Sequence, residues 1–284
     1  MKRFEIVKKR KISDTMNWYT IYAPLVAKHA KPGQFIIFRV DEFGERVPIT
    51  MADHDSEKGT VDIIVQTVGK SSMLLASLEE GDCLADFVGP LGQPTEMEGL
   101  KKVLIVGGGV GNALAYPIAI GMHRAGIYVE MICGFKNKEL VILEDELRAG
   151  VDKLHILTDD GSYGEKGFTT QKEEELLQAG NEYDEIFAVG PAIMMKFVCE
   201  MATKYDTESM ASLATYMIDG TGMCRCCRAT VGGELKFVCV DGPDFNGAEI
   251  DWDQLIKRGR TFQEQEAEAK EHVCKLVGGV RVNA

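Results

Sequence analysis

The stretch VLIVGGGVGNALA (residues 103–115) narrows most strongly the folds that this chain of 284 residues can adopt. The apolar run before the glycines predicts a buried strand, the consecutive glycines predict a tight turn, and the alanine-rich run after them predicts a helix. The apolar region continues to residue 122 and has the length of a membrane span, but the glycines, Asn112 and Pro117 argue against one. A strand, a glycine turn and a helix in this order are typical of a parallel sheet with right-handed crossovers.

The chain after residue 100 continues this alternation. Apolar runs predict further strands, and runs with helical periodicity predict helices between them. The predicted strands cover residues 102–108, 127–135, 153–161 and 185–191, and the predicted helices cover residues 111–126, 143–150, 169–180 and 192–205. We therefore expect an α/β domain with a parallel sheet over residues 98–215.

The first 97 residues follow a different pattern. Short β-rich runs, separated by glycine, proline or charged residues, predict an antiparallel barrel or sandwich with one helix over residues 71–81. The predicted strands cover residues 4–12, 17–25, 34–40, 47–53, 60–68 and 82–90. The expected fold class is therefore a β domain over residues 1–97 joined to the α/β domain. A small cysteine-rich loop region at 216–249 and a polar tail at 250–284, with a predicted helix over 262–277, complete the chain.

The charge of the chain limits its partners. Its 32 Lys and Arg and 44 Asp and Glu residues give a net charge of 32 − 44 = −12, which argues against a nucleic-acid or anionic-membrane binder. The basic run KKRK at residues 8–11 is typical of a solvated strand edge. The N-terminus has a positive start but no apolar core after it, so we expect no signal peptide. We therefore expect a cytoplasmic protein, in which reduced thiols favour metal sites over disulfides.

The glycine turn is a candidate nucleotide site. Backbone amides at the start of such a helix attract anions such as a pyrophosphate, and glycines let the backbone approach the anion closely. The candidate residues for binding NAD here are Gly107, Gly109, Val110 and Gly111. Their spacing departs from the G-x-G-x-x-G fingerprint, and a tight turn without a ligand is the alternative.

Two more strand ends carry candidate residues for the same nucleotide, because ligands of parallel sheets bind at the carboxyl ends of strands. Asp159 and Asp160 follow the third predicted strand of the α/β domain and are candidates to accept hydrogen bonds from ribose hydroxyls. Two carboxylates would repel a 2′-phosphate, so they favour NAD over NADP; a solvated loop pair is the alternative. Gly190 and Pro191 end the fourth strand and are candidates for the floor under a nicotinamide.

The stretch DGTGMCRCC (219–227) places three cysteines within four residues. Four, two and eleven residues separate Asp219, Cys224, Cys227 and Cys239 in turn, which matches the C-x₄-C-x₂-C…C spacing of a [2Fe–2S] loop with aspartate in the first position. A carboxylate is a harder ligand than a thiolate but also binds iron. Two alternatives remain: Zn²⁺ bound by the same four residues, or Cys226 as the fourth ligand with Asp219 unused. We expect the isolated cysteines to be small buried residues: Cys83, Cys133, Cys199 and Cys274.

A β domain, a nucleotide-binding α/β domain and a C-terminal cysteine loop together resemble the ferredoxin–NADP reductase superfamily. Within it, the stretches DGTGMCRCC, FVCVDGPDF and TDDGSYGEKG are similar to the small subunits of NADH-dependent reduced ferredoxin:NADP oxidoreductases. They are less similar to the electron-transfer subunit of dihydroorotate dehydrogenase, whose loop has four cysteines. The similarity covers nearly the whole chain. Arg225 departs from it, because such loops more often have glycine there.

The resemblance implies FAD in the β domain. RVPITMAD (46–53) is similar to the family's flavin stretch, in which Arg46 would pair with the flavin pyrophosphate and Thr50 would hydrogen-bond near flavin N5. VGKSS (68–72) is similar to the family's phosphate turn, with Ser71 in place of the usual glycine. The residues that the resemblance assigns to FAD are Arg46, Pro48, Ile49, Thr50, Val65, Gly69, Lys70, Ser71 and Ser72.

The resemblance also implies an electron-transfer flavoprotein subunit that passes electrons between NAD(H), FAD and a [2Fe–2S] cluster. The family's assembly couples NADH and reduced ferredoxin to NADP reduction by flavin-based bifurcation, with a larger flavin and iron–sulfur subunit as the partner in a heterodimer. One alternative is the electron-transfer subunit of another oxidoreductase, of the dihydroorotate dehydrogenase, sulfhydrogenase or glutamate synthase type. The other is a non-enzymatic zinc-binding module.

The tail is a candidate contact for the larger subunit. Trp252, Leu255, Ile256 and Phe262 are apolar residues among charges, as in helices that dock into a groove of a partner. The alternative is that the tail packs on its own domain.

Overall fold

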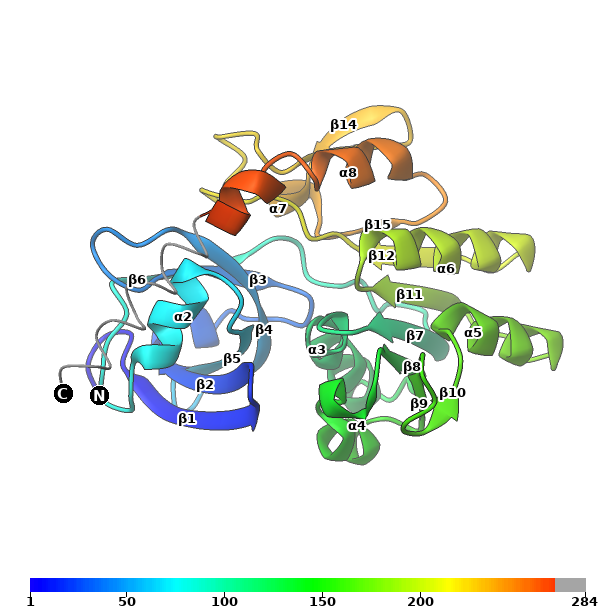
Figure 1. Ribbon diagram of the computed structural model, residues 1–284, viewed down its shortest axis with the longest axis horizontal. Helices are drawn as coiled ribbons and strands as arrows, with labels where there is room; N and C mark the ends of the chain where they lie inside the picture. Colours follow the sequence, from blue (N-terminus) through cyan, green and yellow to red (C-terminus); the bar gives the residue numbers. More distant parts are fainter. Residues whose placement is uncertain (269–284) are drawn as a thin grey trace.

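The structure, a computed structural model, describes residues 1–268 of the chain. Two sheets lie side by side, and the segment that carries the cysteines lies across the top of both in Figure 1. The first sheet is antiparallel and the second is mainly parallel, which confirms the expected fold class. Residues 269–284, which include Cys274 and part of the helix predicted over 262–277, lie outside the described residues.

The first sheet has six antiparallel strands in the order β1-β2-β5-β4-β3-β6. Their bounds are β1 Ile6–Ser13, β2 Met16–Tyr22, β3 Phe35–Arg39, β4 Val47–Asp55, β5 Thr60–Gln66 and β6 Asp86–Leu91. An isolated bridge between Glu5 and Cys83 brings the two outer strands toward each other, so the sheet curls into a barrel (Figure 1). The helices α1 (Pro24–Ala27) and α2 (Lys70–Ser77) add Val26 and Leu75 to the buried core of this barrel.

The second sheet has seven strands in the order β10-β9-β8-β7-β11-β12-β15. Their bounds are β7 Lys102–Gly108, β8 Tyr128–Phe135, β9 Lys153–Thr158, β10 Glu165–Lys166, β11 Glu185–Val189, β12 Ser209–Ser212 and β15 Asp244–Asn246. The helices between them are α3 Gly111–Arg124, α4 Glu144–Gly150, α5 Thr169–Gln178 and α6 Ala192–Lys204, with a short 3₁₀ helix η1 at Lys138–Leu140. Because β7 lies between β8 and β11, the glycine turn after β7 is in the middle of the sheet's carboxyl edge.

Three strands of this sheet escaped the sequence analysis, and the first of them, β10, has only two residues. β12 has only four residues, SMAS, and carries no apolar run. β15 comes from the cysteine region and pairs antiparallel with β12, so that region completes the sheet. Its other elements are the strands β13 (Arg228–Val231) and β14 (Glu234–Phe237) and the helix α7 (Val238–Asp241). The tail after it contains the helix α8 (Trp252–Arg258) and helical residues 263–268.

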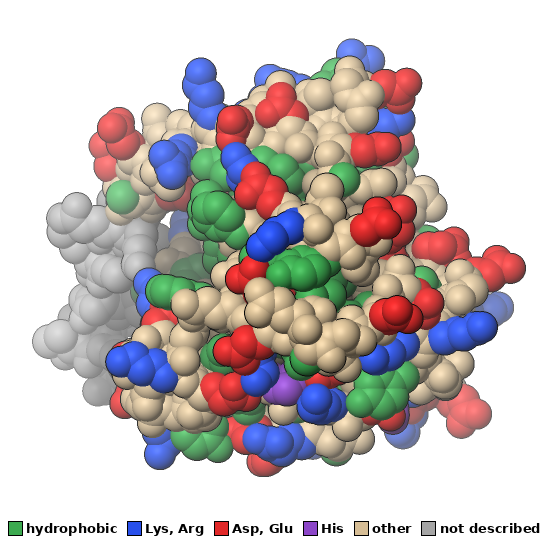
Figure 2. Space-filling view, turned by 90° about the vertical axis from the view of Figure 1, so that its right-hand side faces the viewer, with side chains coloured by type: hydrophobic (Ala, Val, Ile, Leu, Met, Phe, Trp, Pro, Cys, Tyr) green, Lys and Arg blue, Asp and Glu red, His purple; other side chains and the backbone are tan. Residues whose placement is uncertain are grey.

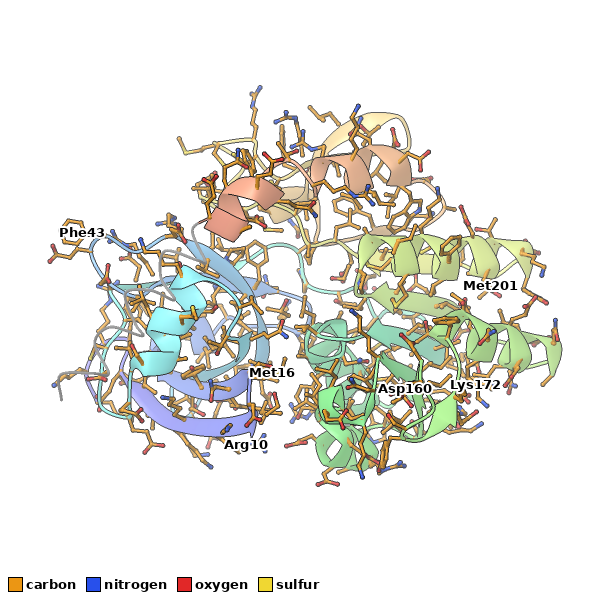
Figure 3. All side chains as sticks on the ribbon, viewed as in Figure 1. Arg10, Met16, Phe43, Asp160, Lys172 and Met201 are labelled. Atoms are coloured by element: carbon orange, nitrogen blue, oxygen red, sulfur yellow. The ribbon has the colours of Figure 1, made fainter. Side chains whose placement is uncertain are left out.

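The barrel and the α/β domain pack directly against each other. Barrel residues, among them Met16 and Ile64, share one buried cluster with helix α3. The ring of Trp18 meets the ring of Tyr116 edge-on, with their centroids 5.6 Å apart. Met16 lies on the side of the barrel that faces the α/β domain (Figure 3). Apolar contact therefore fixes how the two domains sit on each other.

Helix α8 packs on its own chain, so the partner contact expected of Trp252 and Leu255 is wrong. Each is only 7% exposed and lies in the core shared with α6. The indole N–H of Trp252 donates to a backbone carbonyl at 3.0 Å, which satisfies its polar group. Ile256 is partly buried, whereas Phe262 is 49% exposed and touches the ring of Tyr216. Phe262 is the one of the four anchors that stays largely on the surface.

Of the isolated cysteines within residues 1–268, one is exposed although burial was expected for all of them. Cys133 and Cys199 are buried as expected, but the expectation is wrong for Cys83, which is exposed where the chain turns into β6. Figure 2 shows acidic and basic side chains intermixed over the outer face of the α/β domain. Among residues 1–268, no helix is long and apolar enough to cross a membrane.

Glu173 in α5 gives the folded protein a pH dependence. Its side chain is fully buried, and neither carboxyl oxygen has a hydrogen-bond partner among the described residues. Burial raises the pKa of Glu173 from 4.5 to about 9. The folded chain therefore keeps a proton that the unfolded chain releases, and the free energy of unfolding should fall between these two pH values. The slope is at most about 1.4 kcal/mol per pH unit.

Replacing Glu173→Gln should remove this slope and stabilise the protein at pH values well above 4.5, because the amide has no proton to lose. Urea unfolding at a pH near 5 and at a pH near 8 measures the effect. Equal stability losses for wild type and variant between the two pH values would show that the Glu173 carboxyl is not the group that titrates.

Candidate functional site

The glycine turn is held tightly against the end of a neighbouring strand. Gly109 has a φ of +56°, in the left-handed region that favours glycine. A Cβ added at Gly111 would lie 2.4 Å from the carbonyl oxygen of Val189 and 2.5 Å from the Cα of Gly190. No side chain fits at Gly111 without a backbone shift. The structure thus brings the glycine turn together with Gly190 and the adjoining Pro191, which were predicted from separate strand ends.

Asn112 holds this turn and was missed by the sequence analysis. Its side chain is fully buried, and its Nδ2 donates to the carbonyl oxygen of Gly109 at 2.9 Å. A Cβ at Gly107 would lie 2.1 Å from the Oδ1 of Asn112, so glycine is required there as well. The Asn112 Oδ1 has no hydrogen-bond partner within residues 1–268. An asparagine directly after a glycine turn was the available sequence signal.

Asp159 and Asp160 differ in their surroundings, although both are exposed after β9. The Oδ1 of Asp160 accepts hydrogen bonds from the backbone N–H of Ser162 at 2.9 Å and from its hydroxyl at 2.6 Å. These bonds lower the pKa of Asp160. The backbone N–H of Asp159 donates to the last residue of β8, Phe135, at 2.9 Å. Asp160, labelled in Figure 3, thus stabilises its own loop, whereas no hydrogen bond within residues 1–268 engages the Asp159 carboxylate.

A pocket opens where the barrel, helix α3 and the segment before the cysteines meet. It has about 630 Å³ of space, part of it open to solvent, and its walls include three of the four residues predicted from the flavin stretch, Pro48, Ile49 and Thr50. The other walls come from Phe35, Ile64, Ala113, Leu114, Ser212, Leu213, Ala214, Thr215, Met217 and Pro243. The hydroxyl of Thr215 is buried and has no hydrogen-bond partner among the described residues. A largely apolar pocket with a few hydroxyl groups suits a flat aromatic ring such as a flavin.

The predicted phosphate turn is built around Ser72. Its hydroxyl oxygen accepts from the backbone N–H of Val68 at 2.9 Å and of Gly69 at 3.0 Å. The hydroxyl of Ser71 donates to the Glu45 carboxylate at 2.7 Å. Helix α2 then starts at Lys70. The side chain of Val65 lies in the barrel core, so only its backbone is available to a ligand.

The cysteine loop brings its four predicted ligands together as two pairs. The sulfurs of Cys227 and Cys239 are 3.2 Å apart and buried. The Oδ2 of Asp219 accepts from the backbone N–H of Cys224 at 2.9 Å. Hydrogen bonds from Cys224 and Thr221 hold the pKa of Asp219 well below its usual value. In the part of the chain that the structure describes, no group of three or more His, Cys, Asp or Glu side chains is already gathered around one metal position.

The backbone of the loop fits a path around a cluster. Gly220 and Gly222 have φ values of +79° and +83°, and Arg225 has a φ of +57°. Arg225 therefore occupies a position that favours glycine, which explains why similar loops more often have glycine there. The thiol of Cys226 makes a weak hydrogen bond to the carbonyl oxygen of Cys224, with 3.7 Å between sulfur and oxygen. The thiols of Cys227 and Cys239 lie side by side, and the same loop carries two further thiols and the Asp219 carboxylate. Thiolates with a carboxylate are ligand types that suit iron.

Comparison with known proteins assigns two parts of the chain to families. The family model of the oxidoreductase FAD-binding domain matches residues 3–95. The family model of the iron–sulfur cluster binding domain of dihydroorotate dehydrogenase B matches residues 214–251. These two ranges contain the barrel and the cysteine loop.

Similar proteins cover nearly the whole chain. A Thermotoga maritima homologue of the dihydroorotate dehydrogenase B (NAD(+)) electron transfer subunit is 45% identical over 274 residues, 96% of each chain. The Bacillus caldolyticus dihydroorotate dehydrogenase B (NAD(+)) electron transfer subunit is 31% identical, and the match covers 87% of this chain and 97% of that protein. A chain in the structure of an NADH-dependent reduced ferredoxin–NADP oxidoreductase superposes with a TM-score of 0.90 at 44% identity, over 96% of this chain and 98% of the other.

The chain thus combines an antiparallel barrel, an α/β sheet with a glycine turn and a cysteine loop, and its relatives match it over nearly its whole length. The chain belongs to the family of dihydroorotate dehydrogenase B electron-transfer subunits and is an oxidoreductase subunit with an FAD-binding domain and an iron–sulfur domain.

Proposed function

We propose that this chain passes electrons between NAD(H), FAD and a [2Fe–2S] cluster, as the smaller subunit of a complex that couples NADH and ferredoxin to NADP by flavin-based bifurcation. The observation that carries the proposal is the pocket whose walls come from the barrel, from helix α3 and from the segment before the cysteine loop. One pocket thereby adjoins all three candidate sites. The 44% identity to a chain of the NADH-dependent reduced ferredoxin–NADP oxidoreductase supports this choice of complex. A cytoplasmic location, as expected from the sequence, is part of the proposal, because thiols that stay reduced favour metal sites over disulfides.

The proposed division of labour follows the sequence expectation. Residues 1–97 hold FAD, residues 98–215 hold NAD(H), residues 216–249 hold the cluster, and residues 250–284 include a partner contact. When bound, FAD supplies a ring that exchanges a hydride with a nicotinamide and single electrons with an iron–sulfur cluster. Pro48, Ile49 and Thr50 line the pocket for that ring, while Arg46 and the turn at 69–72 hold its pyrophosphate.

The nucleotide site is proposed at the carboxyl edge of the second sheet. The amides around Gly109 and Gly111 hold the pyrophosphate of NAD(H), and Gly190 and Pro191 lie against the same turn. Asp159 is the better candidate for the ribose hydroxyls, because one oxygen of Asp160 is already occupied by Ser162.

NADH should therefore reduce the bound flavin much more efficiently than NADPH. Replacing Asp159→Asn should narrow this preference by about one to two decades, because a hydrogen bond to a charged group contributes about 1.5–3 kcal/mol. Asp160→Asn is the matched control and should have the smaller effect. Rapid mixing with each nucleotide, followed by flavin absorbance, measures the preference. Equal efficiency for the two nucleotides would place the ribose elsewhere.

The cluster is proposed on Asp219, Cys224, Cys227 and Cys239, with about two irons per chain. A carboxylate donates less electron density to iron than a thiolate, so Asp219→Cys should lower the cluster's reduction potential. Redox titration followed by electron paramagnetic resonance tests this, and metal analysis separates iron from zinc. An unchanged spectrum and potential would remove Asp219 from the ligand set. Loss of the cluster in Cys226→Ser would make Cys226 a ligand instead.

The proposed partner is a larger flavin and iron–sulfur subunit, which also gives access to ferredoxin. The surface candidate is Phe262 and the chain after it, because Trp252 and Leu255 are committed to the core. Deleting residues 260–284 retains α8 and should leave FAD and the cluster bound while abolishing co-purification of the partner. A truncated chain that still assembles would place the contact elsewhere. A dihydroorotate dehydrogenase subunit as the co-purified protein would identify the alternative complex.

A further inference from the structure

Arg46 connects two parts of the molecule that are far apart in the sequence. Its Nε donates to the carbonyl oxygen of Ile218 at 2.7 Å, and its Nη2 donates to that of Asp219 at 3.5 Å. These residues lie directly before the cysteines. A guanidinium has five N–H donors, and these two bonds leave three for an anion. Arg46 makes no ion pair within residues 1–268, so its charge is not neutralised there by a carboxylate of the chain.

The backbone that Arg46 holds is the start of the cysteine loop. From this point Asp219 accepts hydrogen bonds from the backbone N–H groups of Thr221 at 2.8 Å and Cys224 at 2.9 Å, so its position sets the path of the loop. Gly220 lies against the barrel: a Cβ there would be 2.7 Å from a methyl carbon of Leu91. A shift of the Asp219 backbone would therefore move both a candidate ligand and the chain that leads to the next one.

The other side of Arg46 is the flavin site. The adjacent Glu45 accepts from the Ser71 hydroxyl at 2.7 Å, which places this stretch beside the phosphate turn at the start of α2. Pro48, two residues further on, lines the pocket. The stretch that carries Arg46 thus lies between the phosphate turn and the pocket, beside the place where the pyrophosphate of FAD is proposed to bind.

We propose that Arg46 makes FAD binding and cluster retention mutually dependent, because one guanidinium holds both the pyrophosphate and the start of the cysteine loop. The inference rests on the proposed function, in which Arg46 pairs with FAD. Ordering an arginine costs side-chain entropy, and once one set of bonds has ordered Arg46 the second set forms at lower cost. The coupling is therefore positive, and linkage requires the same factor in both directions.

The test uses the full chain with its cluster, depleted of flavin. Iron release to a ferrous chelator is followed with and without saturating FAD. FAD should slow release about fivefold or more in the wild type. Arg46→Lys keeps a positive charge for the phosphates but lacks the planar fork of donors, so the protection by FAD should fall to nearly nothing. Arg39→Lys is the matched control, because Arg39 pairs with Asp86 on the same barrel and should retain the protection.

Separate titrations of FAD into cluster-containing and cluster-free protein distinguish the possible failures. The affinity for FAD should be higher in the cluster-containing protein, because a positive coupling acts in both directions. Equal protection by FAD in wild type and Arg46→Lys, or none in the wild type, would overturn the link while leaving FAD binding intact. An FAD affinity that is the same in wild type, Arg46→Lys and Arg46→Gln would instead overturn the assignment of Arg46 to the pyrophosphate.

Discussion

The apolar contact between helix α3 and the barrel fixes the geometry on which the candidate sites depend. The T-shaped pair of Trp18 and Tyr116 and the buried cluster around it hold α3 at one place on the barrel wall. The same helix begins at the glycine turn, and its residues Ala113 and Leu114 line the pocket. One rigid element thus positions the proposed nucleotide site relative to the proposed flavin site. A hydride can pass between two rings only when they are held within contact distance, so this packing is a functional constraint as well as a source of stability.

Most of the fold was readable from the sequence, because its strands and helices carry strong local signals. Strand β7 was predicted at its observed bounds, since an apolar run ends there in three glycines. Strands β12 and β15 have four and three residues and form by pairing with each other and with β11. Their stability comes from partners distant in the sequence rather than from propensity, so no local pattern announces them.

The candidate site was only partly readable, for a related reason. The glycines of the turn were predicted because a positive φ and a close approach leave a mark on the sequence. The third wall of the pocket, which includes Thr215 and Pro243, comes from segments on both sides of the cysteines that approach the barrel only in the folded chain. The spacing of apolar residues in the tail did not reveal whether Trp252 packs in the core of its own chain or against a partner. A protein core and a protein–protein interface both exclude water, so both select apolar side chains.

The cysteine region is built into the protein rather than attached to it. β15 hydrogen-bonds to β12 at the edge of the second sheet, and the hydroxyl of Thr95, in the segment that links the two sheets, donates to the Asp244 carboxylate at 2.6 Å. Cys227 and Cys239 lie in the same buried cluster as Ile37 of the barrel and Leu104 of the second sheet. Because the rate of electron transfer depends steeply on distance, a flexibly attached cysteine region would make the rate vary with its position. Burying Cys227 and Cys239 in the shared core instead gives the proposed cluster a fixed distance to the pocket, and the stability of the whole chain maintains that distance.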